Sequence, residues 1–318
     1  MVEMTKTRIR CRLFAGIALG ICCIGGCLTN SVMAQTESGE AATANPNQAP
    51  PKASQISGPR TPDWVPLPPK HAQFLDEVLR YWEQHTSKIQ RFRCRFKRWE
   101  YDQVFGPGEN QAKTYADGEI KYVAPDKGLF KVDKLMAFTR DNQDPEGRFV
   151  EQPELADHWL CDGKAIFRFD YQRKVLTEHR LPPEMHGKAI THGPLPFLFG
   201  ANAADIKRRY WLRVITPEDR TQGPDREYWL EAIPKSQVDA TDYRAIHIMI
   251  DGKDFLPKGM VLFGRTGGNR QSFVFDNRDV NFNILAEKIN IFHRQFYEPK
   301  LPSSDWKKVI HGAEQARR

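Results

Sequence analysis

Residues 157–179 show the alternation of apolar and polar positions that is typical of short antiparallel strands. In residues 165–169, Ala-Ile-Phe-Arg-Phe, every second side chain falls on the same side of an extended chain. Two turn signals bound this run. Asp162-Gly163 suits a tight hairpin because glycine reaches positive φ without a steric penalty, and residues 170–173, Asp-Tyr-Gln-Arg, form the second turn. The segment therefore predicts three strands of a meander.

The same alternation recurs along most of the chain and predicts further strands. These span residues 92–101, 115–123, 128–133, 211–216, 228–233, 245–250, 257–264, 271–277 and 287–291. Helical spacing of apolar residues occurs at 69–87, and shorter helices are expected at 194–199 and 203–210. The pattern predicts a mainly β fold with some α-helix, in which a curved antiparallel half-barrel sheet is covered on its concave face by helices.

The first 34 residues have the parts of a secretory signal peptide. A basic stretch precedes the apolar run 13–28, and Val32-Met33-Ala34 supplies a small-residue cleavage motif. A retained anchor fits less well, since a membrane span requires about 20 apolar residues. Ile24-Gly25-Gly26-Cys27 resembles a bacterial lipobox, so acylation of Cys27 is an alternative. We expect an exported protein of the periplasm or cell envelope, either cleaved after Ala34 or lipid-anchored through Cys27.

The remaining chain divides into a linker, one domain and a tail. Residues 35–66 are rich in Ala, Pro and Gln and predict a disordered linker, because they bury too little apolar surface to offset chain entropy. Residues 67–311 suit one domain, followed by a tail at 312–318. Without residues 1–34, the formal net charge falls from +7 to +4, so the basic composition is partly due to the signal peptide.

Two of the six cysteines, Cys94 and Cys161, lie outside the signal peptide. An oxidising compartment permits a disulfide between them. Each shares a strand face with aromatic residues, so two buried free thiols are an equal alternative. The sequence leaves this choice open.

The order of several segments resembles a known superfamily. The segments are the first helix running into Phe-Arg-Cys-Arg-Phe at 92–96, Gly-Glu-Ile-Lys-Tyr at 118–122 with a turn at Pro125, the Asp-Gly-Lys and aromatic run of 159–171, the apolar 194–199, Ile-Pro-Lys at 233–235, and the tail 292–310. In this order they resemble the LolA-like and LolB-like lipoprotein-carrier superfamily, most closely its uncharacterised exported planctomycete-type LolA-like domains. The resemblance implies an open half-barrel lidded by helices. Two features depart from the carriers. Ala124 stands where carriers usually have a basic residue before the proline, here Pro125, and residues 140–156 are an extra polar stretch. These departures argue against lipoprotein shuttling by the carrier mechanism, whereas an acyl-binding cavity remains compatible with the sequence.

Strand alternation places aromatic side chains on the concave face as the lining of an apolar cavity. These residues are Phe92, Phe96, Phe130, Trp159, Phe167, Phe169, Phe273 and Phe275. The alternative is an ordinary packed core. A lid is expected at 194–210, with Leu195, Phe197, Leu198 and Phe199 as its apolar body and Gly193 and Gly200 as hinges.

Other chemistry is not indicated by the sequence. A basic stripe on the strand 92–101 and just before it consists of Arg91, Arg93, Arg95 and Lys97, which alternate with apolar residues. The phenylalanines therefore lie on the opposite face, and no aromatic is beside these cations for base stacking, so nucleic acid is not an expected partner. Attraction to an anionic membrane surface is the remaining functional interpretation. His158 and Cys161 face opposite sides of a strand and do not suggest a metal site. No cofactor motif or nucleophile elbow occurs, so we expect no enzyme.

Three functions fit these observations. The first is a non-enzymatic envelope protein that binds a lipid or the acyl chain of a lipoprotein. The second is an envelope sensor or scaffold with a filled core, as in the LolA-like domains of stress regulators. The third is an unrecognised hydrolase with paired carboxylates of different acidity. The sequence does not indicate an oligomeric state.

Overall fold

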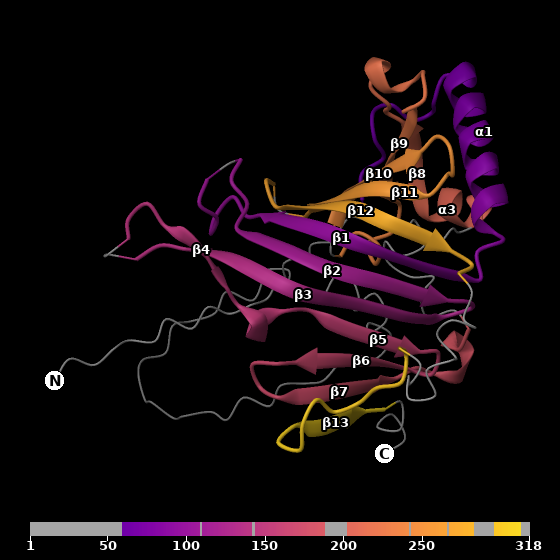
Figure 1. Cartoon of the computed structure of the whole chain (residues 1–318). Coiled ribbons are helices and arrows are strands. Elements are labelled where there is room, and N and C mark those ends of the chain that lie inside the picture. The colour runs from indigo at the N-terminus through magenta and orange to yellow at the C-terminus, as the bar shows by residue number, and fades with distance from the viewer. Residues whose placement is uncertain are drawn as a thin grey trace, which may run out of the picture.

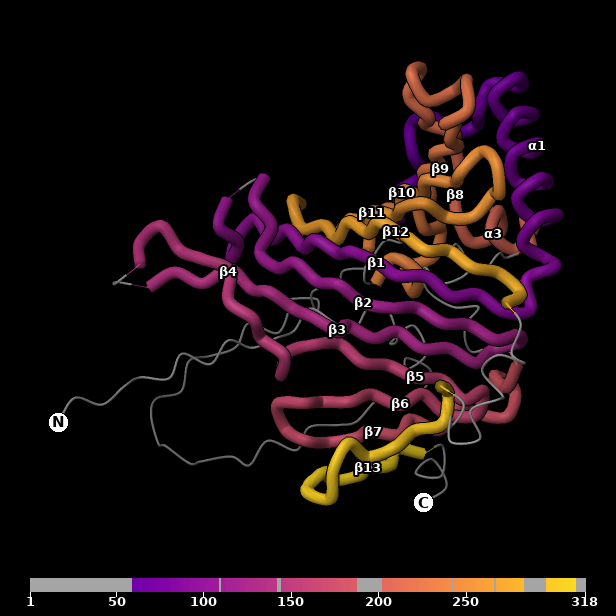
Figure 2. The backbone as a smooth tube through the Cα atoms, viewed as in Figure 1, coloured from indigo at the N-terminus to yellow at the C-terminus, as the bar shows by residue number. Residues whose placement is uncertain are grey.

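The computed structural model describes residues 59–108, 110–141, 144–187, 202–241, 243–265, 267–282 and 296–312. A long curved sheet dominates them, with a helix standing against one end (Figures 1 and 2). The helices are α1 Pro69–Thr86 and α3 Ala203–Arg209, with short 3₁₀ turns at Pro153–Leu155, Pro183–Met185 and Glu218–Arg220. The strands are β1 Arg91–Tyr101, β2 Thr114–Val123, β3 Lys127–Thr139, β4 Arg148–Glu151, β5 His158–Asp162, β6 Ala165–Asp170, β7 Val175–Arg180, β8 Tyr210–Val214, β9 Glu227–Pro234, β10 Tyr243–Asp251, β11 Pro257–Gly264, β12 Arg270–Val280 and β13 Lys307–His311.

The described strands form one open sheet. Its order is β13-β7-β6-β5-β3-β2-β1-β12-β11-β10-β9-β8, and β4 pairs with β3 outside this path. Neighbours are antiparallel except β7 and β13, which are parallel. Within the described ranges, β13 and β8 are the two edges of the path and do not pair with each other. The predicted mainly β, curved half-barrel is therefore confirmed.

Helix α1 covers the concave face near β8–β12. It begins with proline at its first position, where a missing N–H costs nothing. Leu75, Val78, Leu79 and Trp82 recur at helical spacing, and all four are buried in the cluster that contains the inward residues of β1 and β10–β12. Burial of each such side chain contributes about 1.5–3 kcal/mol. The predicted helix at 69–87 is confirmed, and α3 matches the helix expected at 203–210.

The other face of the sheet is covered at its β5–β7 end by the C-terminal segment. Trp306 is buried there against Phe169 and Tyr171, and Phe296 and Leu301 pack on the same cluster. Strand β13 then adds to the edge of β7 (Figure 1). Both faces of the sheet are thus packed, by different parts of the chain.

Two strands, β4 and β13, were not predicted. Every residue of β13 is exposed, and β4 is exposed at three of its four positions, so neither shows the alternation that marks a half-buried strand. The predicted turns are present: Asp162 Oδ1 accepts hydrogen bonds from the amides of Lys164 and Ala165, and Gly163 has φ of 91°. The strand expected at 287–291 lies outside the described residues.

Within the described part of the chain, neither helix combines the length and the hydropathy that a bilayer span requires.

Candidate functional site

Six of the eight aromatic residues predicted to line a cavity lie on the concave face, where they pack together. Phe96 stacks on Phe130 with ring centroids 4.8 Å apart, and its ring is 5.9 Å from that of Phe273. Phe92, Phe96, Phe130, Phe273 and Phe275 are buried in the same cluster as the inward side of α1, and Trp159 packs at its margin. In the described residues these rings are packed as part of the core.

Phe167 and Phe169 lie on the opposite face of the sheet, so their prediction as concave lining is wrong. The register pairs Trp159 with Arg168 and Leu160 with Phe167, and cross-strand partners point to the same face. Phe167 and Phe169 therefore pack with Leu160 beneath the C-terminal segment. Alternation within one strand fixes which residues share a face, but the turn before it decides which face that is.

Cys94 and Cys161 do not form a disulfide; both are free and buried. They lie on β1 and β5, with β2 and β3 between them. Three strand spacings separate them by about 14 Å along the sheet, whereas a disulfide requires Cα atoms within about 7 Å. Burial raises the pKa of each thiol to about 12, so neither is a reactive thiolate.

A buried ion cluster continues the concave face beyond Phe96. Arg98 Nη1 lies 2.9 Å from Asp157 Oδ2, and Arg98 Nε lies 3.1 Å from Glu100 Oε1. Burial raises the pKa of Glu100, although Arg98 opposes this shift. The cluster links β1 to the segment before β5. Because both carboxylates pair with the guanidinium of Arg98, the burial of their charges has a structural explanation.

The residues considered for a metal site point apart. His158 stacks on Phe169 with ring centroids 4.0 Å apart, and its Nδ1 lies 2.8 Å from the hydroxyl of Tyr171. Cys161 packs with Leu181 in another cluster. Burial lowers the pKa of His158 to about 4. No group of three or more metal-capable side chains occurs among the described residues.

Two of the four alternating basic residues of β1, Arg93 and Arg95, form ion pairs. Arg93 Nη2 lies 2.8 Å from Asp279 Oδ2, and Arg95 Nη1 lies 2.6 Å from Asp133 Oδ2. Such exposed pairs contribute little stability. They nevertheless reduce the positive potential that an anionic membrane surface would require.

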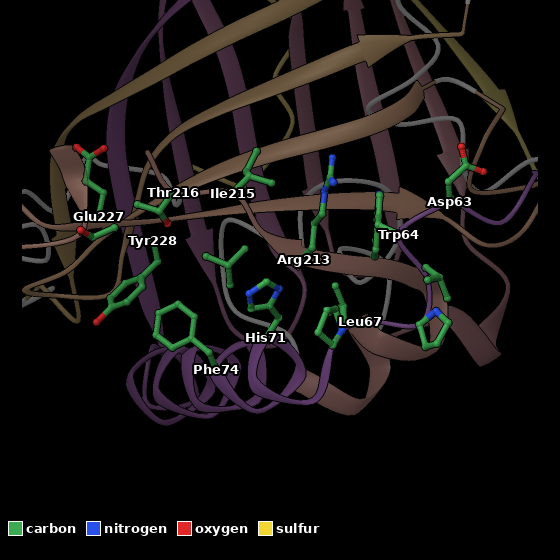
Figure 3. Close-up of a pocket in the computed structure, with 15 residues that line it drawn as sticks. Asp63, Trp64, Leu67, His71, Phe74, Arg213, Ile215, Thr216, Glu227 and Tyr228 are labelled. Carbon is green, nitrogen blue, oxygen red and sulfur yellow. The ribbon is translucent and has the colours of Figure 1, made fainter. Parts of the chain in front are cut away.

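One open concavity among the described residues is a groove between α1 and β8, with a volume of about 720 Å³ (Figure 3). We call it the α1–β8 groove. Its wall is formed by residues 63–68, the start of α1, the end of β8 and the start of β9; its members are Asp63, Trp64, Val65, Pro66, Leu67, Pro68, His71, Phe74, Arg213, Val214, Ile215, Thr216, Thr221, Glu227 and Tyr228. This volume falls in the range of about 300–1,000 Å³ that is typical of small-molecule sites.

The two ends of the α1–β8 groove differ in chemistry. At one end, the guanidinium carbon of Arg213 lies 5.0 Å from the ring centroid of Trp64. At the other, Phe74 and Tyr228 approach with ring centroids 6.4 Å apart (Figure 3). Leu67 belongs to the apolar wall that these rings continue. Strand alternation places Val214 on the α1 side of β8 and Arg213 on the other side, and Figure 3 shows the guanidinium pointing away from Phe74 and Tyr228.

The acidic residue at the aromatic end is already neutralised. Glu227 is buried, and its carboxylate accepts hydrogen bonds at 2.7 Å from Lys258 Nζ and from Trp229 Nε1. Burial alone would raise its pKa, but these two donors hold the pKa below its ordinary value. Asp63 is fully exposed beside Arg60. The acids of the groove consequently offer little repulsion to an anionic ligand.

This groove was not predicted. The composition of residues 35–66 placed Trp64 in a linker, whereas in the structure Trp64 packs against Arg213. The apolar run Trp64-Val65-Pro66-Leu67, directly before a helix, was the available signal. The predicted lid residues Leu195, Phe197, Leu198 and Phe199 lie outside the described residues, as does Cys27.

Comparison with known proteins gives distant structural neighbours only. No family model matches the sequence, and no curated protein matches it. An uncharacterised conserved protein from Thermus thermophilus is similar with a TM-score of 0.38 and 12% identity, over 75% of this chain and 100% of that one. A LolA superfamily protein from Nitrosomonas europaea is similar with a TM-score of 0.30 and 10% identity, over 66% of this chain and 94% of that one. A chain of the MucA/MucB complex from Pseudomonas aeruginosa is similar with a TM-score of 0.33 and 10% identity, over 68% of this chain and 60% of that one. The neighbours include the superfamily that the sequence resembles, and at these TM-scores they carry no argument about ligand or partner.

Proposed function

We propose that this protein is an exported, non-enzymatic binding protein of the cell envelope that holds a hydrophobic chain, from a lipid or a lipoprotein, in the α1–β8 groove. The observation that supports this most is the exposure of apolar groove residues: Phe74 is 45% exposed although it lies 6.4 Å from Tyr228. Large apolar side chains that gather in a concave site are typical of ligand pockets. A bound chain would remove this surface from water.

The groove is a better candidate than the interior of the half-barrel. The interior aromatics contact one another and are buried in one cluster with the inward residues of α1, so a ligand there would have to displace packed side chains. Displacing Leu79 and Trp82 alone would expose two fully buried side chains, at about 1.5–3 kcal/mol each. The groove accepts a chain without this cost.

A protein-binding scaffold is the second candidate. The packed interior favours it, because a filled core is what a scaffold predicts and a carrier with a central cavity does not. The two candidates differ in their ligand: a scaffold takes no free amphiphile in the absence of a partner protein.

Two variants on the same helix test the groove. Phe74 and Tyr81 are 45% and 44% exposed on α1, but only Phe74 lines the groove. We expect Phe74→Asp to weaken binding of a fluorescent fatty-acid analogue more than tenfold, because a carboxylate would then face the chain, whereas Tyr81→Asp should bind as the wild type does.

Native mass spectrometry of protein purified without detergent provides the complementary measurement. We expect a lipid-sized adduct on the wild type that is absent from Phe74→Asp. If the wild type binds neither the probe nor a lipid, the proposed function is wrong. If Phe74→Asp and the wild type bind equally, the site lies elsewhere.

A further inference from the structure

We propose that β13 is a docking edge for an extended acidic segment of a partner protein, which adds to the sheet as a further strand. This edge lies at the end of the sheet opposite to α1, and its use does not depend on the α1–β8 groove (Figure 2). Three features of β13 support the proposal: its unpaired backbone groups, the exposure of its side chains and its excess of positive charge.

One side of β13 is paired with β7, and the other side is open. The amide of Lys307 donates to the carbonyl of Lys174, and the register with β7 stays regular as far as His311. In a parallel pair, every second residue bonds to the neighbouring strand. The N–H and C=O groups of Lys308 and Ile310 therefore point away from β7. Among the described residues, no strand pairs with them.

The side chains of β13 are uncovered on both faces. All five are exposed, and the two apolar ones, Val309 and Ile310, are 40% and 48% exposed and point to opposite faces. At the other edge of the sheet, the inward residues of β8 are buried with α1 and α3. An unpaired edge strand with exposed apolar residues is a template for pairing with another chain. The cover that protects β8 is not present at β13.

Positive charge is in excess along β13. Its sequence, Lys-Lys-Val-Ile-His, contains no acid. Lys308 Nζ lies 2.6 Å from Glu178 Oε2, and the other oxygen of this carboxylate accepts a hydrogen bond from Arg180 Nε at 2.9 Å, so one acid serves two cations. Lys307 lies on the opposite face and forms no ion pair within the described ranges. A carboxylate on an added strand would pair with it across the two strands.

The same charges disfavour a second copy of this chain as the occupant. An antiparallel pairing of two β13 strands about Val309 would place Lys307 opposite His311 of the second copy, and like charges opposite each other are destabilising. A strand in which acidic and apolar residues alternate instead places its carboxylates on the face of Lys307 and its apolar side chains beside Ile310. Main-chain hydrogen bonds then supply affinity, and the alternating side chains supply specificity.

The first test compares two labelled octapeptides by fluorescence anisotropy, one of alternating Glu and Val and one of alternating Lys and Val. We expect the wild type to bind the acidic peptide at least tenfold more tightly at low ionic strength, where surface charges are least screened. N-methylation of two consecutive central amides of the acidic peptide should weaken its binding at least tenfold, because it removes a donor from each edge of the added strand. Equal binding of the methylated peptide would exclude strand pairing and overturn the inference.

Ile310→Pro tests the edge in the protein itself. Proline lacks the N–H that points away from β7, and an edge strand tolerates proline at such a position. The variant should lose at least tenfold in affinity for the acidic peptide, while its urea midpoint and its affinity for the fatty-acid probe stay those of the wild type. Ile310→Val keeps the amide and is the matched control, so its affinity should stay within about twofold of the wild type.

Lys307→Gln tests the charge. It should reduce the preference for the acidic peptide at least threefold, whereas Lys253→Gln, which removes an exposed lysine from the turn between β10 and β11, should keep it. Equal binding of the two peptides by the wild type, or equal binding of the acidic peptide by Ile310→Pro and the wild type, would overturn the inference and leave the proposed function standing. A wild-type dimer at sedimentation equilibrium that Ile310→Pro abolishes would make a second copy the occupant and would also overturn it.

Discussion

The interior of the half-barrel and the α1–β8 groove use similar residues in opposite ways. Phe96 in the interior is 1% exposed and contacts other rings on two sides, whereas Phe74 in the groove is 45% exposed. Both are phenylalanines at regular positions of a strand or helix. The difference lies in packing: Phe96 belongs to the buried cluster that includes the inward side of α1, whereas the start of the same helix leaves the groove open.

This difference shows that an aromatic stripe does not by itself indicate a binding site. A curved sheet must bury one face, and side chains that serve this purpose pack to native density. Binding surface is found where packing is incomplete. The groove meets this condition because residues 63–68 cross to β8 at Trp64 and leave a gap beside Phe74.

The largest effect is expected from breaking the packed interior. Phe96→Ala should lower the free energy of unfolding by about 3–5 kcal/mol, since a buried ring and its contacts with Phe130 and Phe273 are lost. Urea unfolding measures this change. Val274→Ala, on the exposed side of β12, is the control and should cost under about 1 kcal/mol.

Ligand binding decides what the Phe96 result means. Folded Phe96→Ala protein should bind a fatty-acid probe with unchanged affinity. If binding is lost while the urea midpoint is unchanged, the interior aromatics line a ligand cavity and the distinction between the two regions fails.

The second packed cluster, beneath the C-terminal segment, predicts a dependence on pH. Burial lowers the pKa of His158 to about 4, against 6.5 for the unfolded chain. The folded state therefore disfavours the protonated form, and stability that is fully present above pH 6.5 is lost progressively between pH 6.5 and about pH 4. The expected loss is about 3 kcal/mol. Urea unfolding between pH 7 and pH 4 measures it.

His158→Phe separates this effect from general acid denaturation. Phenylalanine can still stack on Phe169 but does not titrate, so the variant should lose about 3 kcal/mol less than the wild type over the same pH range. Equal losses in the two proteins would mean that His158 is solvated, and that the β5–β7 face is open rather than packed.

The sequence predicted the periodic parts of the fold well and the site poorly. Helix 69–87 and the strands around Phe96 were identifiable because one side of each is buried, which produces a regular pattern. Strand β13 was missed because all its residues are exposed, and Phe167 was placed on the wrong face because a hairpin register, not alternation, determines the face. The groove was missed because residues distant in sequence, Trp64 and Arg213, form it together.

The smallest change in stability is expected in the groove. Trp64→Ala removes a partly exposed ring whose contact with Arg213 contributes about 0.5–1 kcal/mol, so the free energy of unfolding should fall by under about 2 kcal/mol. Affinity for a fatty acid should fall about tenfold, because residues 63–68, which form one wall of the groove, lose their contact with β8. Trp99→Ala is the matched control: this tryptophan packs on Tyr115 away from the groove, so binding should be unchanged. Calorimetric titration and urea unfolding of both variants separate the two outcomes. A large loss of stability with unchanged affinity for Trp64→Ala would show that Trp64 belongs to the packed core, and the groove would then no longer contrast with the interior.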